Sequence, residues 1–333
     1  MKVLIVGSGG REHAIAWSVS KSPKVDKIYC APGNAGIAEL AECVDIGAME
    51  FEKLADFAQE KEIDLTIIGM DDPLVGGVVD VFEARGLKVF GPRKNAAILE
   101  GSKAFSKDLM KKYNIPTAAY ENFDDPEKAL EYLRTEARFP IVLKADGLAL
   151  GKGVLICKDL KEAEDGVKEI MEDKKFGNAG NTMVIEEFMT GREVSVLSFV
   201  DGKTIRTMTS AQDHKRAQDG DQGLNTGGMG TFSPSPFYTE EVDEFCRKYV
   251  YQPTVDAMAA EGRPFKGIIF FGLMLTADGP KVLEYNAVLS LCFHFRLPDL
   301  SFFYSHNSYG INRIKDKMRG NLRHKHFIMS FFF

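Results

Sequence analysis

Short apolar runs alternate with amphipathic stretches over the first hundred residues. Val3–Val6 is a continuous apolar run, the pattern of a parallel strand covered on both faces. Strands that alternate with helices predict right-handed βαβ units and an open parallel sheet, which we expect to end near Gly101 after the turn Gly91-Pro92. The predicted strands are 3–6, 27–31, 65–69 and 87–91, and the predicted helices are 11–20, 51–61 and 74–85.

From residue 102 onward the pattern mixes helices and strands. Three helices have predicted N-caps: Ser102, Asp125 before Pro126, and Asp159, which forms a capping box with Glu162. The first runs to about 113 and the third to about 173, and a longer helix is predicted at 239–260. Predicted strands are 141–144, 153–157, 183–188, 193–200, 204–209, 268–275 and 281–285, the last two flanking the hairpin turn Asp278-Gly279. We expect 212–230 to be a loop.

Composition narrows the class of protein. With 44% hydrophobic and 27% charged residues among 333, the chain is an ordinary globular protein of two or three domains. A net charge of −6 does not indicate a nucleic-acid partner. Five scattered cysteines without C-x-x-C spacing argue against a disulfide framework and favour a reducing compartment. Without an apolar run of about 20 residues, we expect no membrane partner and a cytoplasmic location.

The composition changes near residue 287. Residues 288–333 hold seven basic and two acidic side chains, whereas residues 1–287 carry a net charge of −11. The same last segment contains four of the six histidines and eight of the 24 phenylalanines. We therefore expect a tail unrelated to the rest of the chain.

Two glycine-rich segments are candidate phosphate-binding loops. The turn Gly7–Glu12 joins a predicted strand to a helix, where free backbone N–H groups suit an anion, and Arg11 adds a fork of donors. Glu12 stands at the third glycine position of a dinucleotide fingerprint, which disfavours a nicotinamide enzyme. The second segment, 146–153, joins two strands, and Lys144 precedes it, so lysine and loop amides could clamp phosphates. A tight turn and an exposed hairpin are the simpler alternatives.

Two acidic segments are candidate nucleotide and metal contacts. Glu186 and Glu187 end a strand whose backbone could read an adenine edge, and a carboxylate there could accept ribose hydroxyls. Glu284 and Asn286 alternate along a strand, so both side chains share one face and offer hard oxygen ligands for Mg²⁺. Solvated surface residues are the alternative in each case.

Together and in this order, these segments resemble the ATP-grasp ligases, and within them the phosphoribosylamine–glycine ligase family. The resemblance covers residues 1–287. It implies an α/β fold with an N-terminal open parallel-sheet domain at 1–101, an ATP-grasp α+β domain at 102–287, and a missing C-terminal domain. The matching segments are VLIVGSGGREH at 3–13, APGNAG at 31–36, Gly91-Pro92, 101–103, KADGLALGKG at 144–153, EEFMTGREVS at 186–195, DHKR at 213–216, GLNTGGMG at 223–230 and LEYNA at 283–287.

The resemblance implies a reaction that joins glycine to 5-phosphoribosylamine, with ATP and Mg²⁺ or Mn²⁺, through glycyl phosphate. It implies a cytoplasmic monomer in purine biosynthesis and identifies no catalytic base. The ATP contacts would be Lys103, Lys144, Gly147, Gly151, Lys152, Gly153, Glu186, Glu187, Phe188 and Glu193. The substrate contacts would be Gly9, Gly10, Arg11, Asp213, Lys215, Asn225, Thr226, Gly227 and Gly228, and the metal ligands Glu284 and Asn286. For residues 213–216 the alternatives are a solvated charge run and His214 as a catalytic base, and we favour a structural or substrate-contact role.

The resemblance stops after Ala287. Family members continue with Arg-Phe-Gly-Asp-Pro-Glu and a further domain, whereas this chain continues Val288-Leu289-Ser290. We expect the tail at 288–333 to be a frameshift product or a sequence error, with a real basic or aromatic interaction tail as the alternative, and we expect the activity to be impaired. The alternatives are a non-catalytic ATP·Mg²⁺-binding remnant and another ATP-grasp carboxylate–amine ligase.

Overall fold

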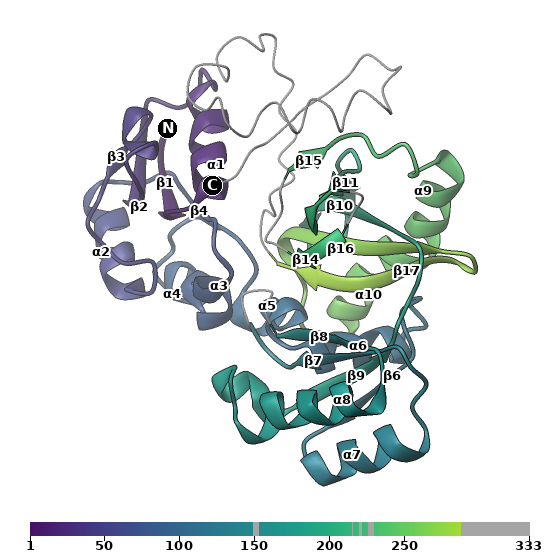
Figure 1. Cartoon of the computed structure of the whole chain (residues 1–333). Coiled ribbons are helices and arrows are strands. Elements are labelled where there is room, and N and C mark those ends of the chain that lie inside the picture. The colour runs from purple at the N-terminus through teal and green to yellow at the C-terminus, as the bar shows by residue number, and fades with distance from the viewer. Residues whose placement is uncertain (149–152, 215, 220–221, 226–229, 288–333) are drawn as a thin grey trace.

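The computed structural model describes residues 1–148, 153–214, 216–219, 222–225 and 230–287. Figure 1 shows an N-terminal unit built on one five-stranded sheet and a second part built on two four-stranded antiparallel sheets. Among the described residues, no helix is both long and apolar enough to cross a membrane.

The N-terminal sheet is open and entirely parallel, as predicted, with strand order β3-β2-β1-β4-β5. Its elements are β1 (Lys2–Gly7), α1 (Gly10–Ser20), β2 (Lys27–Pro32), η1 (Ile37–Glu39), β3 (Glu42–Cys43), α2 (Phe51–Glu60), β4 (Leu65–Ile68), α3 (Asp71–Gly76), α4 (Val78–Ala84), β5 (Val89–Phe90) and α5 (Lys94–Gly101). The single helix predicted at 74–85 was wrong: Gly77 adopts φ +103°, a left-handed conformation that separates α3 from α4. The sequence pattern also missed β3 and α5.

The second part begins with a small antiparallel sheet in the order β6-β9-β7-β8. Its elements are α6 (Lys103–Lys112), β6 (Tyr120–Phe123), α7 (Pro126–Thr135), β7 (Ile141–Ala145), β8 (Val154–Cys157), α8 (Leu160–Val167), η2 (Lys168–Glu172), η3 (Gly177–Asn181) and β9 (Met183–Glu187). Ser102, Asp125 and Asp159 cap their helices as predicted. Leu143, Ile185 and their neighbours pack under α7 and α8, so one sheet face forms a core.

The large antiparallel sheet has the order β11-β10-β16-β17. Its elements are β10 (Arg192–Asp201), β11 (Ile205–Thr207), α9 (Glu240–Cys246), the π-helical η4 (Arg247–Tyr251), α10 (Gln252–Ala260), β16 (Lys266–Thr276) and β17 (Gly279–Asn286). The helix predicted at 239–260 is therefore continuous but contains a π-helical segment just before Pro253, which cannot donate a backbone hydrogen bond. The loop expected at 212–230 instead contains β12 (Gln212–Asp213), β13 (Arg216–Gln218) and β14 (Gln222–Asn225), and β15 (Thr231–Phe232) pairs with β12.

The N-terminal unit and the large sheet share a core. Val3 and Ile5 of β1 pack in one cluster with Leu197 of β10 and Ile268 and Phe270 of β16. The opposite face of the parallel sheet packs on α2 and α4. Since the shared core fixes the N-terminal unit against the large sheet, loops at its strand ends are held at a set position relative to β17.

Candidate active site

The first glycine-rich turn is organised by a buried carboxylate. Glu12 is 2% exposed, and its Oε2 accepts a hydrogen bond of 2.5 Å from the Gly9 N–H. A Cβ atom at Gly7 or Gly69 would lie 2.6 Å or 2.3 Å from the Glu12 side chain, so both glycines make room for it. Burial raises the pKa of Glu12, although its bond to Gly9 and the nearby Arg11 oppose the rise.

This arrangement sharpens the prediction for the turn. Because the Gly9 N–H is committed to Glu12, the amides left to meet an anion are those of Gly10 and Arg11 in the first turn of α1. The carboxylate also fills the place where a dinucleotide fingerprint has its third glycine. The turn therefore suits a single phosphate group rather than a dinucleotide.

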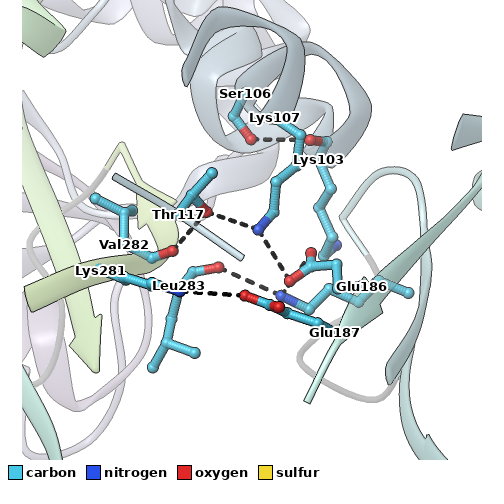
Figure 2. Close-up of polar contacts among 10 residues, drawn as sticks. Lys103, Ser106, Lys107, Thr117, Glu186, Glu187, Lys281, Val282 and Leu283 are labelled. Atoms are coloured by element: carbon cyan, nitrogen blue, oxygen red, sulfur yellow. Dashed lines mark hydrogen bonds and ion pairs between the residues drawn. The ribbon is translucent and has the colours of Figure 1, made fainter. Parts of the chain in front are cut away.

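A buried ion cluster lies at the boundary of the small sheet and α6. Glu186 on β9 lies between two lysines: its Oε2 is 2.9 Å from Lys107 Nζ and its Oε1 is 2.9 Å from Lys144 Nζ. Figure 2 shows the Lys107 side chain directed from α6 toward Glu186. The contact at Oε1 is an ion pair without hydrogen-bond geometry, while Lys144 Nζ donates to the Leu283 carbonyl at 3.3 Å.

The cluster is charge-unbalanced. Burial alone would raise the pKa of Glu186, but the charges of Lys144 and Lys107 hold it below its usual range, so Glu186 is a carboxylate. Burial lowers the pKa of Lys107 to about 8, against the pull of Glu186. With both lysines protonated, one carboxylate faces two ammonium groups, and the surplus positive charge favours an anion at this place.

The second glycine-rich loop is anchored to the start of α6. Asp146 accepts hydrogen bonds from Ser102 Oγ at 3.1 Å and from the Ala104 N–H at 3.0 Å. Lys103 Nζ donates to the Gly147 carbonyl at 2.7 Å, and burial lowers the pKa of Lys103. Two predicted ATP contacts, Lys103 and Gly147, are thus in direct contact.

A β-bulge in β17 aims the two predicted metal ligands. The pairing of β16 with β17 shifts register between Gly272 and Leu273. As a result Val282 and Tyr285 both enter the core, and Glu284 and Asn286 share the opposite sheet face, as predicted. Gly272 lies directly opposite Glu284, where a Cβ atom would come within 3.1 Å of the Glu284 Cγ.

These two residues fit a magnesium ion that is shared with phosphates. No group of three or more His, Cys, Asp or Glu side chains that could hold a metal occurs in the described part of the chain. A carboxylate and an amide oxygen on one face supply two hard ligands, and Mg²⁺ usually takes its remaining ligands from water and substrate phosphate. Glu284 and Asn286 would hold the ion in this way.

Glu100 connects the N-terminal unit to the hairpin. At the end of α5, its Oε2 accepts a hydrogen bond of 2.6 Å from the Ala287 N–H, which ties the N-terminal unit to the end of β17. Burial raises the pKa of Glu100 to about 8, and the charges of Arg11 and Glu284 both act on it. Glu100 therefore links α5 directly to the end of the predicted metal hairpin.

Apolar side chains line the same face of the small sheet as Lys144. Val154 and Ile156 on β8 are 36% and 43% exposed, because their neighbours Leu155 and Cys157 face the core instead. At the end of β9, Glu187 is exposed and pairs with Lys281 at 3.2 Å, and the next residue, Phe188, is 38% exposed. An apolar surface beside surplus positive charge suits a nucleotide, with its flat base and charged phosphates.

The remaining predicted contacts are only partly described. Glu193 is exposed on β10, on the same sheet face as Glu284. The Asp213 carboxylate accepts from Thr231 Oγ1 at 2.6 Å, and the Gly153 carbonyl accepts from the Ala145 N–H at 2.9 Å. Asn225 lies in β14. The others, Gly151, Lys152, Lys215, Thr226, Gly227 and Gly228, lie outside the described residues.

Sequence reasoning missed Lys107, Thr117, Glu100, Val154 and Ile156. The spacing Lys103-x-x-x-Lys107 on a helix with a predicted cap could have shown that both lysines share a face. The others became visible only through contacts between distant segments.

Comparison with known proteins agrees with this geometry. Residues 1–100 match the family model of the phosphoribosylglycinamide synthetase N domain, and residues 101–290 match its ATP-grasp (A) domain. The phosphoribosylamine–glycine ligase of Haemophilus influenzae is 53% identical over 289 residues, which cover 86% of this chain and 67% of that protein. The ligase of Caldanaerobacter subterraneus is 50% identical over 287 residues, covering 86% of this chain and 69% of that protein.

Solved structures show the same fold. The crystal structure of phosphoribosylamine–glycine ligase from Thermotoga maritima superposes with a TM-score of 0.74 at 35% identity, covering 87% of this chain and 69% of that one. A biotin carboxylase domain from Hydrogenobacter thermophilus superposes with a TM-score of 0.67 at 16% identity, covering 87% and 64%. With both family models matched in order over residues 1–290, this chain belongs to the phosphoribosylglycinamide synthetase family of ATP-grasp ligases.

Proposed function

We propose that this chain binds ATP with Mg²⁺ and joins glycine to 5-phosphoribosylamine, giving glycinamide ribonucleotide, ADP and phosphate. The relatives at about half identity are named for this ligation. The observation that carries the proposal is Glu186 held between Lys107 and Lys144, facing a bulged strand that presents Glu284 and Asn286.

The reaction needs a carboxylate made electrophilic. An oxygen of the glycine carboxylate attacks the γ-phosphorus, the bond to ADP breaks, and an acyl phosphate forms; the amine of phosphoribosylamine then attacks the carbonyl carbon and phosphate leaves. Mg²⁺, when bound, neutralises charge on the transferring phosphates. Lys144 and Lys103 hold the nucleotide phosphates, and Val154 and Ile156 contact the base. The amides of Gly10 and Arg11 hold the ribose phosphate, which places the amine near Glu284.

The domain division and the remaining site residues are part of the proposal. Residues 1–101 would bind phosphoribosylamine and 102–287 would bind ATP. Gly147 to Gly153 would close over the phosphates, and Glu187, Phe188 and Glu193 would contact the nucleoside. Asp213, Lys215 and residues 225–228 would line the substrate end. We also propose that the protein is a cytoplasmic monomer and that it accepts Mn²⁺ in place of Mg²⁺. Sedimentation velocity tests whether it is a monomer.

A coupled assay of ADP release tests the activity. We expect release that needs both glycine and phosphoribosylamine and stops when either is omitted. Release with formate or bicarbonate in place of glycine would assign a different ligase. Calorimetric binding of Mg·ADP without any turnover would assign a nucleotide-binding remnant.

The tail at 288–333 is relevant to the rate of ligation. The family model ends at residue 290, and the chain spans about two thirds of the length of the curated relatives it matches. We propose that a shifted reading frame produced this tail and that it impairs the ligation. Reading the coding DNA around codon 287 in all three frames tests its origin, because a frame that restores Arg-Phe-Gly-Asp-Pro-Glu would establish the shift. ADP release at the rate of full-length relatives would contradict the impairment.

A further inference from the structure

Lys107 has no role in the site as proposed from sequence, yet it is buried and has two polar partners in this region. It lies on α6, four positions after Lys103, and its side chain is 2% exposed. Besides the ion pair with Glu186, its Nζ donates to Thr117 Oγ1 at 2.8 Å. Figure 2 shows Lys107 reaching toward both partners from one position on the helix.

Thr117 links Lys107 to the large sheet. Its hydroxyl accepts from Lys107 and donates to the Val282 carbonyl at 2.7 Å (Figure 2). Val282 precedes the bulge in β17, and the carbonyl of the next residue, Leu283, accepts from Lys144. Lys144 directly, and Lys107 through Thr117, are therefore linked to two successive carbonyls of the strand that presents Glu284.

A purely structural role does not explain this composition. A buried lysine paired with a carboxylate is rarely more stabilising than apolar side chains of the same volume, and a second buried cation adds a desolvation cost. Here one carboxylate serves two ammonium groups, so the cluster is less stable without a further anion than with one. A bound phosphate group would balance the charge.

We propose that Lys107 is a positioning residue of the nucleotide site. By pairing with one oxygen of Glu186, it keeps Glu186 from neutralising Lys144 completely, so that Lys144 retains charge for a nucleotide phosphate. Through Thr117 it also fixes the bulged segment of β17 from which Glu284 and Asn286 project. This inference rests on the proposed ATP site. It means that one side chain, Lys107, couples the lysines that bind phosphate to the strand that carries the metal ligands.

The test is calorimetric binding of ADP to the full chain, with and without Mg²⁺. In Lys107→Met we expect ADP affinity to fall about 10- to 100-fold, the loss of one charge-assisted interaction. In Lys107→Arg the charge is retained, and most of that affinity returns. In Thr117→Val the ion pairs remain and the Val282 N–H still donates to the Pro116 carbonyl at 2.8 Å, so ADP alone binds as in the parent. The enhancement of binding by Mg²⁺ then falls about 10-fold, as for other residues that orient metal ligands.

Lys111→Met is the matched control, because Lys111 is exposed on the same helix, and we expect no change in ADP affinity. Thermal unfolding of each variant without nucleotide monitors the fold. Parent-like ADP affinity in Lys107→Met would overturn the proposal, since a structural residue alters stability and not affinity. If Lys107→Met does not fold, an unchanged Mg²⁺ enhancement in Thr117→Val overturns it instead. Failure of the parent chain to bind ADP at all would refute the proposed nucleotide site itself.

Discussion

Removing the charge of Glu186 tests the buried cluster most directly. In Glu186→Gln the amide keeps the shape of the side chain, but Lys107 and Lys144 lose the only carboxylate found within 4 Å of either among the described residues. The two 2.9 Å ion pairs are replaced by two buried, unpaired ammonium groups. Breaking a buried pair by removing one partner costs about 3–5 kcal/mol, so the free energy of unfolding should fall by that amount.

Urea unfolding at pH 7 and 25 °C measures the loss. With an m-value of about 3 kcal/mol/M, the midpoint should fall by about 1 to 1.7 M. Glu187→Gln is the matched control at the next position. The Glu187 side chain is 45% exposed and that of its partner Lys281 is 26% exposed, so this ion pair contributes less than about 1 kcal/mol to stability. The double variant Lys107→Met with Glu186→Gln should regain part of the loss, because one of the two stranded cations is gone.

The same variant has a defined pH dependence. Since the two lysines hold the folded-state pKa of Glu186 below its usual range, its contribution to stability is fully present above about pH 4.5 and is lost as the pH falls through the lowered value. The difference between parent and Glu186→Gln should therefore shrink below pH 4.5. A loss at pH 7 no larger than that of Glu187→Gln would refute the reasoning about this cluster.

Three further predictions concern other parts of the molecule. Gly69→Ala should lower stability by about 1–3 kcal/mol in thermal unfolding, because its Cβ would lie 2.3 Å from Glu12 Oε1; an unchanged melting temperature would mean that Glu12 moves aside freely. Glu284→Gln should bind ADP alone as the parent does but lose most of the Mg²⁺ enhancement in calorimetry, and an undiminished enhancement would exclude Glu284 as a ligand. Iodoacetamide at pH 8 should label the exposed Cys43 and spare Cys30, whose pKa burial raises to about 12, as peptide mass spectrometry can show; equal labelling would contradict the burial.

The parts of the fold that depend on neighbouring residues could be predicted from the sequence. Ser102, Asp125 and Asp159 each accept a hydrogen bond from an amide two or three positions ahead, so a short window contains the whole interaction. The hairpin at Asp278-Gly279 is equally local. The prediction of one helix at 74–85 was wrong because apolar spacing continues across Gly77, and a periodic pattern does not report the φ angle of a single glycine.

The candidate site could be predicted only as separate pieces. Glu284 and Asn286 were expected to share a face from strand alternation, and they do, but the bulge that places Val282 and Tyr285 together in the core leaves no mark in that pattern. Lys144 contacts a carbonyl 139 positions away, and Thr117 contacts one 165 positions away. Such contacts depend on the packing of two sheets, which neither composition nor local spacing determines.

The arrangement of charge explains why these distant contacts matter together. The positive charges come from α6 and β7, which carry Lys103, Lys107 and Lys144. Glu284 comes from β17, the strand that faces them, so neither group of elements has balanced charge by itself. The single carboxylate of Glu186 satisfies the two lysines only in part and leaves a net attraction for phosphate on its side of the site. On the facing strand, the carboxylate of Glu284 carries a negative charge, and a divalent cation would neutralise that charge. A nucleotide with its metal ion is therefore the ligand that balances both halves at once, and binding either component alone should be weaker than binding the two together.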